Sequence, residues 1–343
     1  MELSSKNGEL MDSVTGLLPG QWYNLLRDNG FKISRPGRTA IITALTLRNR
    51  NYLKKEKRLY PAEPPSAPVS LPPLFILGHW RSGTTFLHNL LSLDKQFTFP
   101  HVYQVNNPHT FLYIRQCFQK ELTERSAKKR SMDNIKTSPV SPGEEEFALA
   151  VLTLTSPLIG WLFPQRQEYY DRYTTFEKVA PEITERWKKS YGAFFSKIQF
   201  ADPGMPILSK SPLNTARIRL LNSIFPGARF IFIHRHPLQV FKSTRRLYDS
   251  AIALSAFQKR KYDVDARILK RYAEIHRAYL EQKTEIDSDK LLEVSFEELD
   301  SDPLKVVQQI YRFHKLEGFD DFKMEAEQYL SGLNHKKNRY NEA

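Results

Sequence analysis

Residues 74–85 read Leu-Phe-Ile-Leu-Gly-His-Trp-Arg-Ser-Gly-Thr-Thr, and the chain continues as Phe-Leu-His-Asn-Leu-Leu over 86–91. The first four residues are apolar and have the length of a buried strand, and the last six have the composition of a helix. Glycine and small polar residues fill the turn between them. A strand, a compact polar turn and a helix in this order are typical of a phosphate-binding loop.

The loop departs from the common nucleotide-binding pattern at one position. Gly78 and Gly83 keep the spacing of G-x-x-x-x-G-K-[ST], in which the lysine after the second glycine reaches the terminal phosphates. Here Thr84 takes the lysine position, and the cation, Arg81, lies inside the loop. The pattern predicts a phosphate-bearing ligand other than a simple nucleoside triphosphate. An ordinary strand-turn-helix junction with polar helix caps is the alternative.

Several features of this loop favour anion binding. A helix that begins near Ser82 presents unpaired N–H groups and the positive end of its dipole. Gly83 lets the backbone approach a ligand closely, and the hydroxyl groups of Ser82, Thr84 and Thr85 add donors. Arg81 adds a planar fork of donors that suits phosphate or sulfate oxygens. We expect the loop to bind the anionic end of the ligand.

Two later segments also place a cation beyond an apolar strand. Residues 206–209 precede Lys210, and residues 228–233 lead to Arg235. Short apolar strands that alternate with helices indicate an α/β fold with a parallel sheet covered on both faces. The helical stretches expected around these strands are 147–154, 214–221 and 238–248.

The cations of the three segments are expected to converge. In a parallel sheet, ligands bind beyond the carboxyl ends of the strands. Arg81, Lys210 and Arg235 each follow such an end, so one anion can be held by all three. Ser243 lies eight residues after Arg235, about two helical turns, and can donate a hydrogen bond to the same group.

Composition sets limits on these expectations. The chain has 343 residues, which suits one α/β catalytic domain with helical additions. Its 51 Lys+Arg and 38 Asp+Glu give a net charge of +13, which suits an anionic ligand, a nucleic acid or an acidic membrane surface. A single cysteine, no long apolar run and no visible secretory signal favour a cytoplasmic location.

The beginning of the chain differs from the rest in composition. Residues 1–70 are expected to form a helical extension and a proline-rich linker, followed by a catalytic domain over 71–343. Residues 18–56 have apolar positions at helical spacing and end in a basic stretch. Such a helix either makes peripheral contact with a membrane or lipid acceptor, or packs on the core as a solvated helix.

Together these segments resemble the sulfotransferase family that uses 3'-phosphoadenosine 5'-phosphosulfate (PAPS), in particular its broad bacterial branch. The resemblance implies a P-loop-like sulfotransferase fold, with a central, mainly parallel sheet flanked by helices. It also implies PAPS as donor, 3',5'-adenosine bisphosphate (PAP) as product, and no metal. It rests on the loop at 78–87, the turn at 210–212 and the segment 230–243, and extends to 131–134, 142–149 and 335–340.

The resemblance assigns residues to the donor. Arg81 matches the basic residue that holds the bridging region of the phosphosulfate and steadies the leaving phosphate, and 82–85 match the rest of that loop. Lys210 matches the family's strand-end lysine, and Arg235 with Ser243 matches its 3'-phosphate segment. Basic residues near the C-terminus commonly close over the 3'-phosphate, and here these are Lys336, Lys337 and Arg339.

The implied reaction is an in-line transfer of a sulfuryl group to a hydroxyl, less often an amine, and a hydroxyl acceptor needs a base. The histidine that animal members place two residues after the strand-end lysine is replaced here by Pro212. His101, Glu144 and Glu146 remain as candidates, because a carboxylate beside apolar Phe147 would have a raised pKa. His101 also fits a structural role, and the glutamates also fit the charge preference of a helix N-terminus.

Other protein classes fit parts of the sequence. A P-loop kinase or NTPase predicts lysine at position 84 and a metal-binding aspartate at a strand end, whereas these strands lead to Lys210 and Arg235. A nucleic-acid-binding protein would explain the charge, but no ribonucleoprotein or zinc motif is present, and no nucleic acid is expected. A non-catalytic nucleotide-binding protein would be expected to have lost part of this cation set. The acceptor stays open among lipids, sterols, phenols and carbohydrates.

Overall fold

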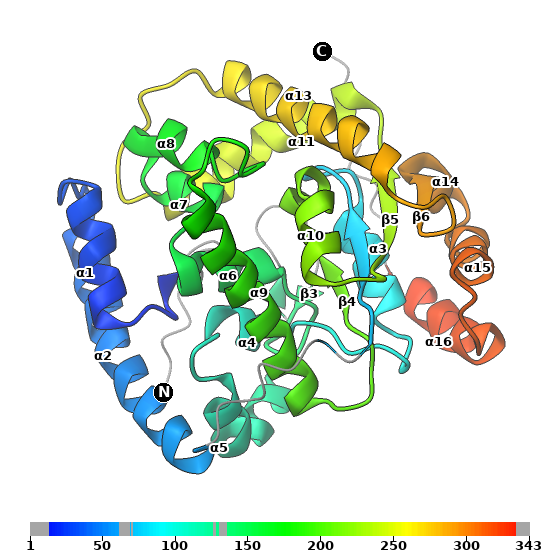
Figure 1. The fold of residues 1–343 in the computed structure, drawn as a ribbon, viewed down its shortest axis with the longest axis horizontal. Helices are drawn as coiled ribbons and strands as arrows, with labels where there is room; N and C mark the ends of the chain where they lie inside the picture. Colours follow the sequence, from blue (N-terminus) through cyan, green and yellow to red (C-terminus); the bar gives the residue numbers. More distant parts are fainter. Residues whose placement is uncertain (1–13, 62–68, 70, 126–127, 130–135, 334–343) are drawn as a thin grey trace.

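The computed structural model describes residues 14–61, 69, 71–125, 128–129 and 136–333 (Figure 1). The candidate donor residues Lys336, Lys337 and Arg339 lie outside the described residues, as does the segment 131–134 that contributes to the family resemblance.

A four-stranded parallel sheet forms the centre of the fold, in the order β4-β1-β5-β6. The strands are β1 (Leu74–Leu77), β4 (Leu208–Lys210), β5 (Arg229–His234) and β6 (Leu291–Ser295). Phe75 lies opposite Ser209 on one side and Phe230 on the other. Thr98 pairs in parallel with Ile207 and so extends the sheet beyond β4. The prediction of a parallel α/β sheet is confirmed, and β6 is a strand that the sequence analysis missed.

Alternate residues of β1 enter two hydrophobic cores, one on each face of the sheet. Leu74 and Ile76 pack with α3 (Thr84–Leu91), α15 (Pro303–His314) and α16 (Phe319–Ser331). Phe75 and Leu77 pack with α6 (Glu145–Thr153), α9 (Pro181–Ala201) and α10 (Ile218–Ile224). Burial of each such side chain stabilises the fold by roughly 1.5–3 kcal/mol. Because both faces of β1 are buried, every residue of this central strand is apolar.

The N-terminal part of the chain forms two helices, α1 (Pro19–Asp28) and α2 (Pro36–Leu59), instead of one continuous helix. The break contains Gly30 and Phe31, both with positive φ, and α2 has Pro36 in its first turn. Trp22, Leu25 and Ile42 join the core that contains Phe75. The two helices lie side by side at one edge of the molecule (Figure 1). No helix in the described part of the chain is both long and apolar enough to cross a membrane.

The helix expected over 214–221 is divided at Arg217. Residues Pro212–Ala216 form a 3-10 helix, and α10 begins at Ile218 because Arg217 has non-helical backbone angles, with φ −132° and ψ 21°. The helices expected over 147–154 and 238–248 form as α6 and α11 (Pro237–Leu247).

The remaining elements connect and surround those described above. They are α4 (Val102–Asn106), α5 (Phe111–Glu124), the two-residue strands β2 (Lys128–Lys129) and β3 (Lys136–Thr137), α7 (Pro157–Leu162), the 3-10 turn Pro164–Arg166, α8 (Gln167–Asp171), the π-helical turn Tyr248–Ile252, α12 (Ala253–Ser255), α13 (Val264–Gln282), the 3-10 turn Lys283–Glu285 and α14 (Phe296–Ser301).

Candidate active site

The loop between β1 and α3 makes its turn with three residues of positive φ. Gly78 has φ 146°, Arg81 has φ 70° and Gly83 has φ 98°. A Cβ atom on Gly78 would lie 2.6 Å from the carbonyl oxygen of Ile233, and one on Gly83 would lie 2.2 Å from Cδ2 of Phe296. Both glycines are therefore required by backbone conformation and by space. Arg81 adopts the left-handed conformation despite its side chain, which is a form of strain found at ligand sites.

Hydrogen bonds fix the interior of this loop. The Ser82 hydroxyl donates to the carbonyl oxygen of His79 at 2.7 Å, and the N–H of Gly78 donates to Oγ1 of Thr215 at 2.7 Å. Burial lowers the pKa of His79 to about 3, so its imidazole is neutral. The Ser82 hydroxyl thus stabilises the backbone of the loop. The N-terminus of α3, which begins at Thr84, is the part of the loop best suited to accept an anion.

Two arginines from different strand ends meet at this loop. Nε of Arg81 donates to Oγ of Ser243 at 2.8 Å, and Nη1 of Arg235 donates to the carbonyl oxygen of Arg81 at 3.1 Å. The guanidinium of Arg235 also lies 4.2 Å from the centre of the Phe296 ring. The structure therefore brings together Arg81, Arg235 and Ser243, which are up to 162 residues apart in the chain.

Lys210 connects the loop to a carboxylate. It ends β4, and only 3% of its side chain is exposed. Its ammonium group donates to Oγ1 of Thr85 at 3.2 Å and forms an ion pair with Glu144, the residue before α6. We call Arg81, Lys210, Arg235, Ser243 and Glu144 the strand-end cluster.

The two glutamates after Glu144 point into the protein. Glu145 accepts hydrogen bonds from the hydroxyl of Tyr191 at 2.7 Å and from Nδ2 of Asn214 at 2.5 Å, and burial raises its pKa. Glu146 pairs with Nη1 of Arg217 at 2.6 Å, and both side chains are buried. The structure therefore places Glu146 in a buried ion pair and brings only Glu144 to the strand-end cluster.

The three glutamates bind three successive parts of one segment. Glu144 pairs with Lys210 at the end of β4, and the next two glutamates bind Asn214 and Arg217 in the turn that follows. Carboxylates at the start of α6 thereby fix the carboxyl end of β4. Removing one member of such a buried pair leaves an uncompensated charge and costs about 3–5 kcal/mol.

His101 lies next to the segment that carries Glu144. Its Nδ1 is 2.7 Å from the carbonyl oxygen of Val140, so Nδ1 carries the proton and donates. The N–H of Gly143 donates to the carbonyl oxygen of Pro100 at 2.7 Å, which holds the two segments together. Burial lowers the pKa of His101, so the ring is neutral at neutral pH.

A model of the sulfotransferase family matches residues 72–321. The chain is also similar to omega-hydroxy-beta-dihydromenaquinone-9 sulfotransferase Stf3 of Mycobacterium bovis, with 32% identity over 323 residues that cover 93% of this chain and 83% of that protein. The protein of the same name from Mycobacterium tuberculosis matches to the same extent. The chain belongs to the sulfotransferase family.

Solved structures agree with this assignment at the level of fold. Sulfotransferase STF9 from Mycobacterium avium superposes with a TM-score of 0.65 and 18% identity, covering 95% of this sulfotransferase and 90% of that chain. Sulfotransferase STF1 from Mycobacterium tuberculosis gives a TM-score of 0.64, also at 18% identity, and covers 93% and 87%. The expected sulfotransferase fold is confirmed, and this protein is an enzyme of the transferase class.

Sequence reasoning missed the residues of this sulfotransferase that support the cluster. Phe296 covers Gly83, and Ser295 before it accepts hydrogen bonds from the N–H groups of Glu297 and Glu298. This Ser-x-Glu-Glu start of α14 is a recognisable helix-start signal that would have placed a strand end at 295. Asn214 and Arg217 have no such local signal, because their glutamate partners are about 70 residues away in the chain.

The described residues contain no group of three or more His, Cys, Asp or Glu side chains arranged to hold a metal ion.

Proposed function

We propose that this sulfotransferase takes its sulfuryl group from PAPS and releases PAP. The support is the chemistry of the strand-end cluster, in which three cations from three strand ends surround the N-terminus of an α-helix. Such a set suits a ligand with several anionic groups. The observation that carries the proposal is the position of Lys210, which bonds at once to Thr85 of the loop and to Glu144.

We assign the donor groups to these residues as follows. Arg81, Lys210 and the first turn of α3 with Thr84 and Thr85 would bind the 5'-phosphosulfate. Arg235 and Ser243 would bind the 3'-phosphate, with Lys336, Lys337 and Arg339 as additional candidates. Charge that develops on the leaving phosphate in the transition state would then lie among fixed cations and N–H groups, where electrostatic stabilisation is strongest.

We propose Glu144 as the base. The side chain of Glu144 is 18% exposed, whereas that of Glu146 is buried in its pair with Arg217. When Lys210 turns to the anionic donor, the Glu144 carboxylate becomes available to the acceptor hydroxyl. His101, with a neutral ring whose Nε2 can accept a proton, is the second candidate. We assign Glu146 to the positioning of α6.

In the proposed reaction the acceptor oxygen forms a bond to sulfur while the bond between sulfur and the bridging oxygen of the donor breaks. The electron pair of that bond leaves with the 5'-phosphate of PAP, and the acceptor proton passes to Glu144. Arg81 and Lys210 keep the leaving phosphate in line with the attacking oxygen. No covalent intermediate with the enzyme is needed.

We propose a hydroxyl on a lipid-like molecule as the acceptor. The name of the Stf3 relative specifies a hydroxylated dihydromenaquinone as its substrate, and that relative is 32% identical to this chain over 323 residues. We propose that residues 71–343 form the catalytic domain. The N-terminal helices would make peripheral contact with the membrane that carries the acceptor. The sole cysteine, Cys117, suits a cytoplasmic location.

A transfer assay tests the proposed function. Purified enzyme is incubated with PAPS labelled in the sulfuryl group and with hydroxylated polyprenyl quinols, sterols, phenols and sugars, and the products are identified by mass spectrometry. We expect transfer to the polyprenyl hydroxyl, with one PAP formed for each sulfate ester. Transfer only to sugars or phenols would contradict the proposed acceptor class, and no transfer from PAPS to any of them would contradict the donor.

A further inference from the structure

The solvent-exposed side of α2 is divided along its length. Its first half exposes apolar and small side chains, with Ile41 50% and Leu47 52% exposed. Its second half exposes cations. We call this surface the α2 face. Its apolar half is Pro36, Ala40, Ile41, Ala44 and Leu47, and its basic half is Arg50, Lys54, Lys55, Lys57 and Arg58.

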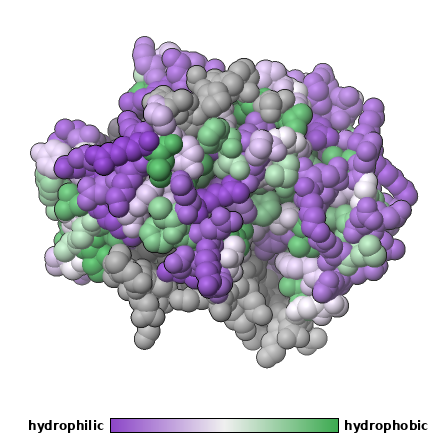
Figure 2. Space-filling model, turned by 90° about the horizontal axis from the view of Figure 1, so that it is seen from below, coloured by the Kyte–Doolittle hydropathy of each residue, from purple (hydrophilic) through white to green (hydrophobic). Residues whose placement is uncertain are grey.

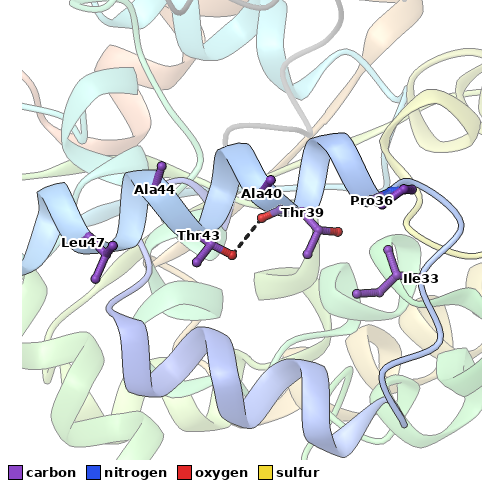
Figure 3. A pocket seen from close by; sticks show the side chains of 7 residues that line it. All are labelled: Ile33, Pro36, Thr39, Ala40, Thr43, Ala44 and Leu47. Atoms are coloured by element: carbon purple, nitrogen blue, oxygen red, sulfur yellow. Dashed lines mark hydrogen bonds between the residues drawn. The ribbon is translucent and has the colours of Figure 1, made fainter.

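A shallow groove of about 530 Å³ runs along the apolar half. Figure 3 shows that its side chains come from successive turns of α2 and from the turn before the helix. Phe31, in that turn, is 53% exposed and lies against the exposed Tyr23 of α1, with ring centres 6.1 Å apart. The lining residues are Ile33, Pro36, Thr39, Ala40, Thr43, Ala44 and Leu47.

The same part of the chain carries most of the excess positive charge. Residues 19–59 contain ten Lys and Arg but only two acidic residues, a net charge of +8 in a chain of +13. Glu56 is buried and pairs with Lys197, so it does not neutralise the surface. On the side where α1 and α2 lie, at the left of Figure 2, hydrophobic and strongly hydrophilic surface adjoin each other.

We propose that the α2 face docks this enzyme on an anionic membrane. The apolar half would enter the boundary between headgroups and acyl chains, and the lysines and arginines would contact the phosphate groups of anionic lipids. Charge complementarity favours this partner, and the exposed Ile41 and Leu47 distinguish the surface from one built for nucleic acid. The inference rests on the proposed lipid acceptor, since such an acceptor would be held in the membrane on which the enzyme docks.

Vesicle binding of the full chain tests this proposal. Co-sedimentation is measured with vesicles of phosphatidylcholine containing 30% phosphatidylglycerol, and with phosphatidylcholine alone. We expect binding to the anionic vesicles and at least tenfold weaker binding to the neutral ones. The charge variant Arg50→Glu/Lys54→Glu should bind at least twentyfold more weakly, because each cation near such a surface contributes about fivefold. The apolar variant Ile41→Ser/Leu47→Ser should bind at least fivefold more weakly.

Matched variants elsewhere on the surface serve as controls. Arg186→Glu/Lys189→Glu changes the same charges on α9, and Leu269→Ser/Leu280→Ser removes equally exposed leucines from α13. Both should bind vesicles like the wild type, and all four variants should keep the wild-type unfolding midpoint. Equal binding by the α2 variants and the wild type would overturn the proposal. The proposal would also be overturned if the wild type did not bind vesicles but formed a dimer in light scattering, and if Ile41→Ser/Leu47→Ser dissociated that dimer.

The result can be separated from that of the proposed function. Vesicle binding requires no donor, so it is measured without PAPS. PAP binding and turnover of a short-chain acceptor in solution require no membrane, and the α2 variants should keep both within twofold of the wild type. Vesicle binding without PAP binding would contradict the proposed donor alone. If PAP binds but vesicle binding does not depend on the α2 face, only the proposed docking surface is contradicted.

Discussion

The strand-end cluster and the α2 face are both rich in cations, but their cations are held differently. Lys210 is 3% exposed and bonds to two other segments, and Arg81 and Arg235 bond to Ser243 and to the loop backbone. On the α2 face, Arg50 and the lysines that follow it are exposed. Cations that are fixed and partly buried stabilise charge at one point, whereas exposed cations attract anionic surfaces without defined geometry.

Positive charge can serve either to stabilise a bound anion in the active site or to attract an anionic surface. A value of +13 is compatible with either use, and only the positions of the cations in the fold distinguish them. The cluster is expected to control the reaction, so activity should depend on its individual side chains. The α2 face is expected to control where the enzyme is located, so membrane binding should depend on the number of charges on this face and on the salt concentration.

The largest effect is expected from Glu144→Gln. Loss of the proposed base should lower kcat by about 10³-fold on a hydroxyl acceptor, within the usual 10²–10⁴-fold range for such groups, with the KM for PAPS within threefold. Steady-state kinetics measure this. Glu182→Gln, at an exposed position on α9, should leave kcat unchanged. A kcat of Glu144→Gln within threefold of the wild type would remove this residue from the chemistry.

The next effect concerns the buried support of the cluster. Glu146→Gln leaves the Arg217 guanidinium buried without its counter-charge, so the free energy of unfolding should fall by about 3 kcal/mol. Denaturant unfolding followed by circular dichroism measures the change. Glu285→Gln removes a carboxylate from the exposed pair with Arg219 and should leave stability unchanged. Equal stability of Glu146→Gln and wild type would mean that this pair does not anchor α6.

Salt should separate the two regions directly. Raising NaCl from about 50 to about 200 mM shortens the Debye length and should weaken binding to anionic vesicles at least tenfold. Turnover of a soluble acceptor at saturating PAPS should change less than twofold, because Lys210 is buried and the half-buried Arg81 and Arg235 are fixed by hydrogen bonds. If both quantities fell together, the cluster and the α2 face would not differ in the way that their exposure indicates.

The smallest effect is expected from His101→Asn. Asparagine can donate to the carbonyl oxygen of Val140 as Nδ1 of histidine does, so kcat should fall less than threefold. Since burial lowers the pKa of His101, its ring is neutral at neutral pH, and the pH–rate profile should keep its shape in the variant. A 10²-fold loss together with loss of the acid limb would make His101 the base in place of Glu144.

Local pattern was enough to find the elements that carry the strand-end cluster. The strand-like runs 74–77, 206–209 and 228–233 and the residues that follow them identified a parallel sheet. They also identified the strand ends from which Arg81, Lys210 and Arg235 reach the loop. Side-chain contacts between distant segments had no local signal. The sequence grouped Glu144 with Glu146, and only the fold shows that one faces Lys210 and the other Arg217.

The same limit applies at the N-terminus. Helical periodicity over 18–56 predicted one helix, and the positive φ of Gly30 and Phe31 divides it into two. The basic stretch was visible in the sequence. The exposure of Ile41 and Leu47 in the apolar half depends on which side of α2 packs against the core, and this is a tertiary property.

Calorimetric titration with PAP tests the central claim most directly. Binding of PAP is compared with that of adenosine 5'-monophosphate, which lacks the 3'-phosphate, in the wild type and in Ser243→Ala. We predict that PAP binds in the micromolar range and at least tenfold more tightly than adenosine 5'-monophosphate, and that Ser243→Ala reduces this preference about tenfold, since hydrogen bonds to charged groups contribute roughly 1.5–3 kcal/mol. Absence of PAP binding at high micromolar concentration, or equal affinity for the two nucleotides, would contradict the account.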